Sequence, residues 1–226
     1  MIRAFFKFWT REHSLTALLV VLVVQLFALI PEVGGGLIIR LAADLALSAF
    51  LLAGLATMAR TRGFKILFSA FIIIGTIVHF ARLLFAVPIL ATWDFMFLML
   101  ALMGMLAVTL KMVYGKGRVT GHRIRGAIAA YLMLAALFGK MYTMIYYFVP
   151  GAFVISPALT QAGLASGDDF LYFSVITLTT VGFGDVTPVA PIARSFVMAE
   201  AFIGQLYPAI LIARLVSLSL MEIEKK

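Results

Sequence analysis

Cysteine is absent from all 226 residues, and its absence excludes disulfide bonds, iron–sulfur centres and zinc sites built on thiolates. Charge is also scarce, since Asp, Glu, Lys and Arg make up 12% of the chain, about half their share in a soluble domain. Three histidines are too few for a dense metal site. Apolar residues make up 64% of the chain, and its mean hydropathy is +1.11. So few polar side chains cannot cover a surface that faces water, which makes the lipid bilayer the expected solvent.

Six apolar runs are each near the roughly 20 residues that a helix needs to cross the hydrocarbon core. They cover residues 15–30, 37–59, 66–87, 95–113, 126–149 and 192–216. Short stretches rich in glycine, proline or charge separate them, such as Pro88 with Trp93 and Asp94 between the third run and the fourth. The sequence therefore predicts an all-α polytopic membrane protein with six transmembrane helices. No cleavage site of small residues follows the first run, so we expect a retained anchor rather than a signal peptide.

The net charge is +8, from 18 Lys and Arg against 10 Asp and Glu. In a soluble protein this excess would suggest a nucleic-acid partner. Here the basic residues gather in alternate loops, with Arg62 and Arg118 among them, whereas Glu32 and Asp94 fall in the loops between. Basic loops stay on the cytoplasmic side of a membrane. We therefore expect both termini in the cytoplasm, a plasma-membrane location and no nucleic-acid partner.

Residues 150–191 fit no spanning helix. The apolar run from Phe170 to Leu178 is too short to cross the bilayer, and a half-length helix that leaves on the side where it entered is re-entrant. Non-helical backbone at that depth is stable only where it is buried in protein or lines an aqueous path. The chain then continues as Thr180-Val181-Gly182-Phe183-Gly184-Asp185.

This hexapeptide resembles the selectivity filter of potassium channels, Thr-Val-Gly-Tyr-Gly-Asp, with phenylalanine in place of tyrosine. A dehydrated K⁺ needs a cage of oxygens, and glycines allow the alternating backbone that turns successive carbonyls toward one axis. The resemblance implies a re-entrant pore helix and a filter between the fifth and sixth helices, completed by four chains. The implied K⁺ ligands are the carbonyls of Thr180, Val181, Gly182 and Phe183 with the Thr180 hydroxyl; Gly184 completes the filter, and Asp185 lies at the outer mouth, where a carboxylate concentrates cations. The alternative is a chance glycine-rich loop between helices.

The function that the resemblance implies is passive K⁺ conduction through a homotetramer in lipid, with no cofactor besides the permeant ion and no enzymatic activity. A weakly selective cation channel is the first alternative, and Phe183 lacks the phenol that braces the usual filter from behind. An ion-transporter subunit with a filter-like loop is the second. A membrane enzyme finds no support in paired carboxylates, a Ser–His arrangement or metal-ligand spacing.

The predicted organisation follows the runs and loops. It comprises a cytoplasmic N-terminus at 1–14, a peripheral four-helix domain at 15–113, a basic linker at 114–125, a pore domain at 126–218 and a short cytoplasmic tail at 219–226. The N-terminus either lies along the membrane interface or is a plain terminus. A voltage sensor needs a basic residue at every third position of one helix, and the fourth run has none before Lys111. Steep voltage gating is therefore not expected, and no motif selects another gating stimulus.

Two intramembrane charges are expected near the filter. Lys140 lies ten residues before Pro150, and Glu200 lies nine after Pro191, so each is roughly 14 Å from the outer end of its helix. We predict that they form an ion pair between the outer and inner helices of the pore domain. In the alternative, Lys140 extends outward to the membrane surface and Glu200 meets polar groups behind the filter.

A second group of charges falls in the peripheral domain. Arg40 and Asp44 are four residues apart on one helix face, and His79 and Arg82 lie at a similar depth in the next run. We predict a structural cluster of Arg40, Asp44 and Arg82 that holds two helices together. A proton- or ligand-sensing role for the group is the alternative.

Two residues of the sixth run favour a bend. Gly204 lies where the inner helix of the resembled channels often has its hinge, and Pro208 removes a helical hydrogen bond. We predict an inner-helix hinge at one or both, with bends that merely improve packing as the alternative.

Overall fold

The computed structural model describes residues 14–24, 26, 62–85, 87–115, 120–157 and 170–223. These residues are mostly helical and fall into two compact units, which are described one at a time. The second apolar run lies outside the described residues, and so do Arg40 and Asp44. Among the described residues, three helical segments are long and apolar enough to span a membrane: Thr92–Val113, Gly121–Phe148 and Pro191–Leu218. A shorter apolar segment, Ala70–Arg82, falls in the third predicted run.

The first unit contains α2 (Ser14–Val24), α4 (Arg62–Phe85), α5 (Pro88–Val113) and the first turns of α6 (Gly121–Phe148). Helices α4 and α5 pack against each other, and the extended backbone of Val87 leads into Pro88. Proline favours that conformation in the residue before it and is well accepted at the first position of a helix. The predicted separation of the third and fourth runs is present, but it falls just before Pro88, which starts α5, instead of extending over residues 88–94. Asp94, expected in a loop, lies in the second turn of α5.

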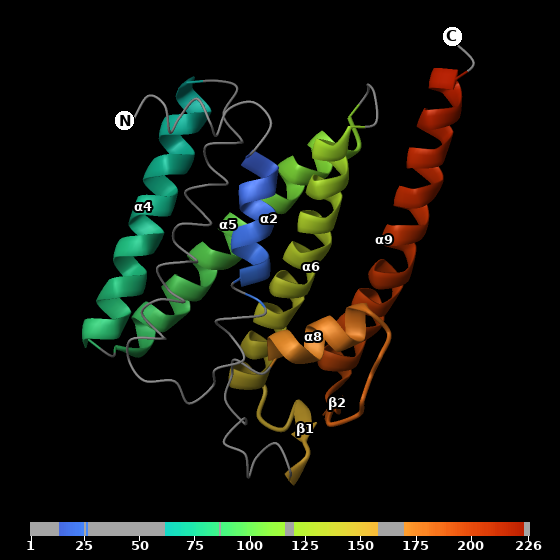
Figure 1. Ribbon diagram of the computed structural model, residues 1–226. Helices are drawn as coiled ribbons and strands as arrows, with labels where there is room; N and C mark the ends of the chain where they lie inside the picture. The colour runs from blue at the N-terminus through green and yellow to red at the C-terminus, as the bar shows by residue number, and fades with distance from the viewer. Residues whose placement is uncertain are drawn as a thin grey trace. The chain divides into compact units, whose positions relative to one another are not determined.

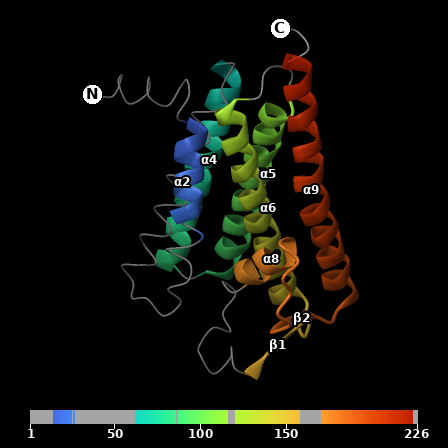
Figure 2. The ribbon, with the colours of Figure 1, turned by 45° about the vertical axis from the view of Figure 1, so that its right-hand side comes forward.

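The second unit contains α6 from Tyr131 onward, β1 (Phe153–Ile155), α8 (Phe170–Leu178), β2 (Val186–Pro188) and α9 (Pro191–Ile223). The bounds of α8 confirm the short helix predicted over 170–178. Both ribbon views show α8 between the later turns of α6 and the first half of α9 (Figures 1 and 2). Its nine residues rise about 13.5 Å, which is less than half of the hydrocarbon core.

Strands β1 and β2 form an antiparallel pair that was not predicted from the sequence. Phe153 lies opposite Pro188, and next to the pair the amide of Ser156 donates to the carbonyl of Asp185 at 2.8 Å. The aromatic and β-branched run 153–155 was the available signal, but three residues are too few to identify a strand. The pair joins the chain that leaves α6 to the chain that enters α9.

Two glycines bring the backbone of α8 close to its neighbours. A Cβ atom built on Gly139 of α6 would lie 2.8 Å from the Cα of Leu171. A Cβ atom on Gly204 of α9 would overlap the carbonyl oxygen of Leu178 and lie 2.9 Å from the carbonyl carbon. Protein interiors are packed too densely to absorb such overlaps. Helix α8 therefore contacts the backbone of α6 near its start and that of α9 at its end.

Helix α9 runs unbroken through both predicted hinge positions, Gly204 and Pro208. Because Pro208 has no amide hydrogen, the carbonyl of Gly204, four residues earlier, lacks its usual helical donor. Gly204 is nevertheless buried and lies directly against α8. The structure thus gives Gly204 a packing role, and a hinge at either residue stays a prediction.

Replacing Gly139 or Gly204 by alanine should lower the melting temperature of the detergent-solubilised protein. Overpacking a close contact costs about 1–3 kcal/mol, and here the added methyl group meets backbone that cannot move aside without moving α8. Gly121→Ala is the matched control on α6, because its Cβ would meet only the end of the Arg125 side chain at 3.4 Å. Equal melting temperatures for all three variants would contradict the close packing of α8.

Candidate functional site

The loop after α8 has an alternating backbone. Thr180, Gly182 and Gly184 have positive φ angles of 63°, 55° and 79°, and the residues between them do not. Glycine adopts this left-handed region without strain, whereas Thr180 is the one non-glycine residue of the described part of the chain that does so. Such strain persists where neighbouring contacts fix the conformation. The alternation is the one expected from the sequence of the loop.

Hydrogen bonds to the end of α8 fix the direction of the loop carbonyls. The amides of Val181 and Gly182 both donate to the carbonyl of Ile176, at 2.8 and 3.1 Å, and the amide of Thr180 donates to Thr177 at 3.0 Å. In a planar trans peptide the carbonyl points opposite to the amide hydrogen. The carbonyls of Thr180 and Val181, which share peptide units with the Val181 and Gly182 amides, therefore point away from α8.

The side of the loop that faces away from α8 is uncovered in the single chain. Val181 is 53% exposed and Phe183 is 70% exposed. Within the described residues, a Cβ built on Gly182 or Gly184 would meet nothing within 4 Å. The predicted site residues 180–184 thus lie together as one exposed stretch of backbone, with oxygens available on the side turned away from α8.

Asp185 ties this loop to α8 and to the strand pair. Its Oδ2 accepts a hydrogen bond from the hydroxyl of Tyr172 at 2.7 Å, and its Oδ1 accepts one from the amide of Val186 at 3.0 Å. Its carbonyl accepts from Ser156, as described above. Asp185 was predicted as a mouth residue, but its bond to Tyr172 was missed because the sequence does not reveal which face of α8 turns toward the loop.

Glu200 is fully buried, with 0% of its surface exposed, and the predicted ion pair with Lys140 is wrong. Its carboxyl group instead contacts two hydroxyl groups: the Tyr142 hydroxyl donates to Oε2 at 2.5 Å, and Ser174 of α8 bonds to Oε1. Lys140 and Tyr142 are two residues apart on α6, about 200° around the helix, so only one of them can face α9. The alternative reading of Glu200, polar groups behind the filter, fits this arrangement.

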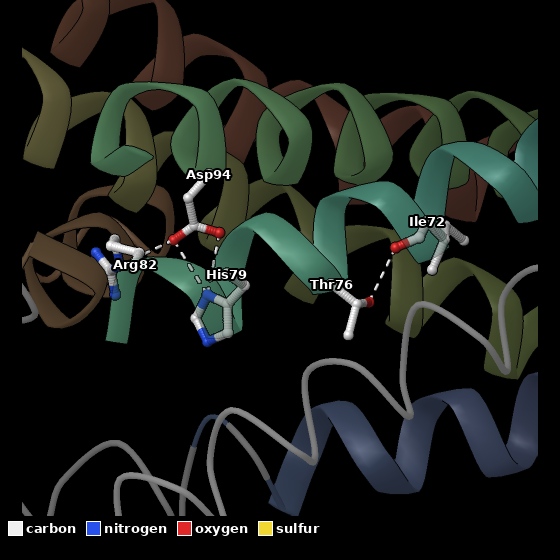
Figure 3. Close-up of polar contacts among 5 residues, drawn as sticks. All are labelled: Ile72, Thr76, His79, Arg82 and Asp94. Carbon is white, nitrogen blue, oxygen red and sulfur yellow. Dashed lines mark hydrogen bonds and ion pairs between the residues drawn. The ribbon is translucent and has the colours of Figure 1, made fainter. Parts of the chain in front are cut away.

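Two of the peripheral charges singled out in the sequence, His79 and Arg82, share an acidic partner that was not predicted, and Figure 3 shows it. Asp94 of α5 supplies the acid: its Oδ1 lies 3.0 Å from His79 Nδ1, and its Oδ2 lies 3.2 Å from Arg82 Nε, both on α4. The predicted partners Arg40 and Asp44 lie outside the described residues. Asp94 was not predicted as a partner, because its place between two apolar runs indicated a loop and not a helix. The cluster joins α4 to α5 within the first unit.

Carboxylates and imidazoles do not form a metal site in the described residues, where no group of three or more His, Asp or Glu gathers. The oxygens that could hold a cation are the carbonyls of the loop. Carbonyl oxygens replace the hydration shell of K⁺ in channel filters, so the donor chemistry of residues 180–183 fits that ion.

Residues 130–219 match the protein family described as ion channel. Protein LctB of Geobacillus stearothermophilus is 38% identical over 92 residues, which cover 37% of this chain and 68% of that protein. Protein LctB of Bacillus caldotenax is 36% identical over 89 residues, which cover 38% of this chain and 64% of that protein. Two pore potassium channel c of Oryza sativa subsp. japonica is 36% identical over 88 residues, which cover 39% of this chain and 18% of the rice protein. No solved structure matches the chain.

The apolar helices, the carbonyl-bearing loop and these matches define a membrane protein with an ion channel domain. The matched residues run from α6 to α9 and contain the whole loop. The chain belongs to the potassium channel pore-domain family, which confirms the resemblance drawn from residues 180–185.

Tyr172→Phe should loosen the loop without unfolding α8. A hydrogen bond to a charged group contributes about 1.5–3 kcal/mol, so amide exchange in residues 179–186 should become about 10- to 100-fold faster when this bond is lost. Hydrogen–deuterium exchange followed by mass spectrometry of that peptide measures the change. Tyr147→Phe on the exposed end of α6 removes the same hydroxyl elsewhere and should leave the peptide unchanged. Unaltered exchange in Tyr172→Phe would show that Tyr172 does not brace the loop.

Asp94→Asn should destabilise the protein by about 1–2 kcal/mol, because it leaves basic side chains facing a neutral amide. The cost stays below that of a fully buried pair, since the Arg82 side chain is 40% exposed. Arg82→Gln and His79→Asn should each cost less, because the carboxylate keeps its other partner. Melting temperatures in detergent rank the three variants. An Asp94→Asn protein more stable than either of the others would argue against the carboxylate as the centre of the cluster.

Proposed function

We propose that four copies of this chain form a channel that conducts K⁺ selectively and passively across the membrane. The observation that carries the proposal is the alternating backbone of residues 180–184, which frees carbonyl oxygens on the side away from α8. Thr180, Val181, Gly182 and Phe183 supply the K⁺ ligands, and Asp185 holds the outer mouth. Membership of the potassium channel pore-domain family supports this assignment.

The tetramer follows from the number of oxygens that a dehydrated ion needs. One chain contributes one loop, and a ring of carbonyls around an axis takes four. Closed rotational symmetry is the usual way to bring identical loops to one axis. The exposure of the loop supports this, and so does α9, where 11% of the spanning segment is buried in the single chain. Its exposed apolar side chains, including Phe202, Leu206 and Ile210, are available to neighbouring copies and lipid.

In the proposed arrangement the chain crosses a bacterial plasma membrane six times, with both termini in the cytoplasm. Helix α8 is re-entrant, and the helices before α6 lie at the periphery. Arg82 of α4 is paired with Asp94 of α5, and α5 has no basic residue before Lys111, which supports a channel without steep voltage gating. No catalytic step and no cofactor besides the permeant ion belongs to this proposal.

A weakly selective cation channel is the competing function. Phe183 lacks the hydroxyl with which tyrosine would brace the filter, and a looser filter admits Na⁺ more readily. An ion-transporter subunit is the more distant alternative, since such a protein needs further filter-like loops and this sequence has one.

Purified protein in liposomes with K⁺ or Na⁺ gradients tests the proposal, together with Gly182→Ala. Wild-type vesicles should release K⁺ much faster than Na⁺. Left-handed backbone costs alanine about 1–2 kcal/mol per chain, and four chains share one pore, so the variant should lose more than about 100-fold in K⁺ flux. Gly151→Ala imposes a similar backbone penalty at φ 74°, outside the loop, and should conduct normally.

Two results would contradict the assignment. Equal K⁺ and Na⁺ fluxes in the wild type would establish the weakly selective channel instead. Normal flux in Gly182→Ala would remove residues 180–184 from the conduction path.

A further inference from the structure

Three fully buried polar side chains from three helices meet behind the filter loop. Glu200 of α9, Ser174 of α8 and Tyr142 of α6 each have 0% of their surface exposed. An ionisable residue inside a membrane-spanning helix is costly and marks a functional position. Conduction through carbonyl oxygens does not use Glu200, so its presence needs a separate explanation.

The hydrogen atoms in this cluster can be counted. Ser174 Oγ lies 2.8 Å from the carbonyl oxygen of Ala135 on α6 and also bonds to Glu200 Oε1. Tyr142 Oη makes the third contact, to Glu200 Oε2. A serine hydroxyl and a tyrosine hydroxyl carry one hydrogen each, and the backbone carbonyl can only accept. Three hydrogen bonds need three hydrogens, and the carboxyl group is the one remaining place for the third.

The groups around Glu200 offer no positive charge to balance an ionised carboxylate. From α6 it faces the Tyr142 hydroxyl, and the Tyr131 phenol is close enough to interact electrostatically. From α8 it faces the Ser174 hydroxyl. Within the described residues, no ion pair includes Glu200. A buried ion without a counter-ion costs several kcal/mol, and a proton on the carboxyl group removes that cost.

We propose that Glu200 is held as a neutral carboxylic acid that donates to Ser174 and accepts from Tyr142, and that it thereby fixes the position of the pore helix against the inner helix. Ser174 passes the hydrogen bond on to Ala135, so one chain of bonds links α9, α8 and α6. Glu200 is a positioning residue: it touches no ion and acts on the filter through α8. This role rests on the proposed channel function, whereas the protonation state does not.

Glutamine and leucine in place of Glu200 should have different effects. A glutamine side chain has a nitrogen that donates and an oxygen that accepts, as a protonated glutamate does, so Glu200→Gln should preserve all three contacts. An ionised glutamate accepts at both oxygens, and glutamine replaces it only if the Ser174 hydroxyl turns its hydrogen to the Ala135 carbonyl, so the infrared measurement below decides the protonation state. Leucine has a similar size but no polar atom, and Glu200→Leu should break both contacts of the cluster with α9.

Infrared spectroscopy of the wild-type protein at neutral pH provides the first measurement. The carbonyl stretch of a protonated carboxyl group, isolated as the difference between wild-type protein and Glu200→Gln, should be present. Its absence would overturn the neutral acid. This measurement needs neither ion flux nor the survival of a destabilised variant, because Glu200→Gln retains the hydrogen-bonding capacity of the cluster.

Flux and amide exchange provide the second measurement. Glu200→Gln should conduct K⁺ within about twofold of the wild type, whereas Glu200→Leu should lose more than about tenfold because two buried hydroxyl groups lose a partner. Exchange of the α8 amides should be unchanged in the first variant and faster in the second. Ser174→Ala and Tyr142→Phe each remove one hydroxyl group of the cluster. Their matched controls are Ser195→Ala on α9 and Tyr147→Phe on α6, where the replaced residues are exposed.

The positioning role would be overturned if the α8 amides exchanged at the same rate in Glu200→Gln as in Glu200→Leu. Normal exchange and flux in Glu200→Leu would overturn it as well. If wild-type vesicles conduct no K⁺, the proposed channel function fails, and the infrared band and the α8 exchange rates still decide the role of Glu200. The two failures are therefore distinguishable.

Discussion

The carbonyl groups at the end of α8 must find hydrogen-bond donors, and most of the second unit is arranged to supply them. Ile176 and Thr177 accept from amides of the following loop, and Leu178 accepts from the Tyr131 hydroxyl at 3.0 Å. To make these hydrogen bonds, the loop turns its amides back toward the end of α8. The loop carbonyls therefore point away from α8. The geometry that suits a cation is thus a by-product of capping a short helix in apolar surroundings.

Such capping works only if α8 is held at a fixed place, and the rest of the unit provides this. Gly139 and Gly204 allow α6 and α9 to approach its backbone. Tyr172 and Asp185 tie its first turn to the far end of the loop. Buried aromatic rings fill the remaining space, with Phe153 and Phe170 centred 4.7 Å apart. Polar contacts and apolar packing together fix the position of the helix.

The sequence was sufficient where a local pattern determines the structure. Length and hydropathy defined α8 to the residue, and the glycine spacing of the loop predicted its alternating backbone. Prediction failed where the answer depends on which faces of two helices meet. Lys140 has the right depth to reach Glu200, but Tyr142 occupies the face toward α9. Asp94 was misplaced because a proline in a sequence can mark either the end of one helix or the start of the next. Only the extended backbone of Val87 shows that Pro88 starts α5.

Glycine serves two unrelated purposes in this pore domain. At Gly139 and Gly204 the limit is volume, because a Cβ atom would meet a neighbouring backbone. At Gly182 and Gly184 there is space in the single chain, and the limit is chirality, since a left-handed backbone suits the mirror image of an ordinary amino acid. A mirror-image alanine should therefore be tolerated by the backbone at Gly182. The loop has glycine there because glycine is the one amino acid of the genetic code without a chiral centre.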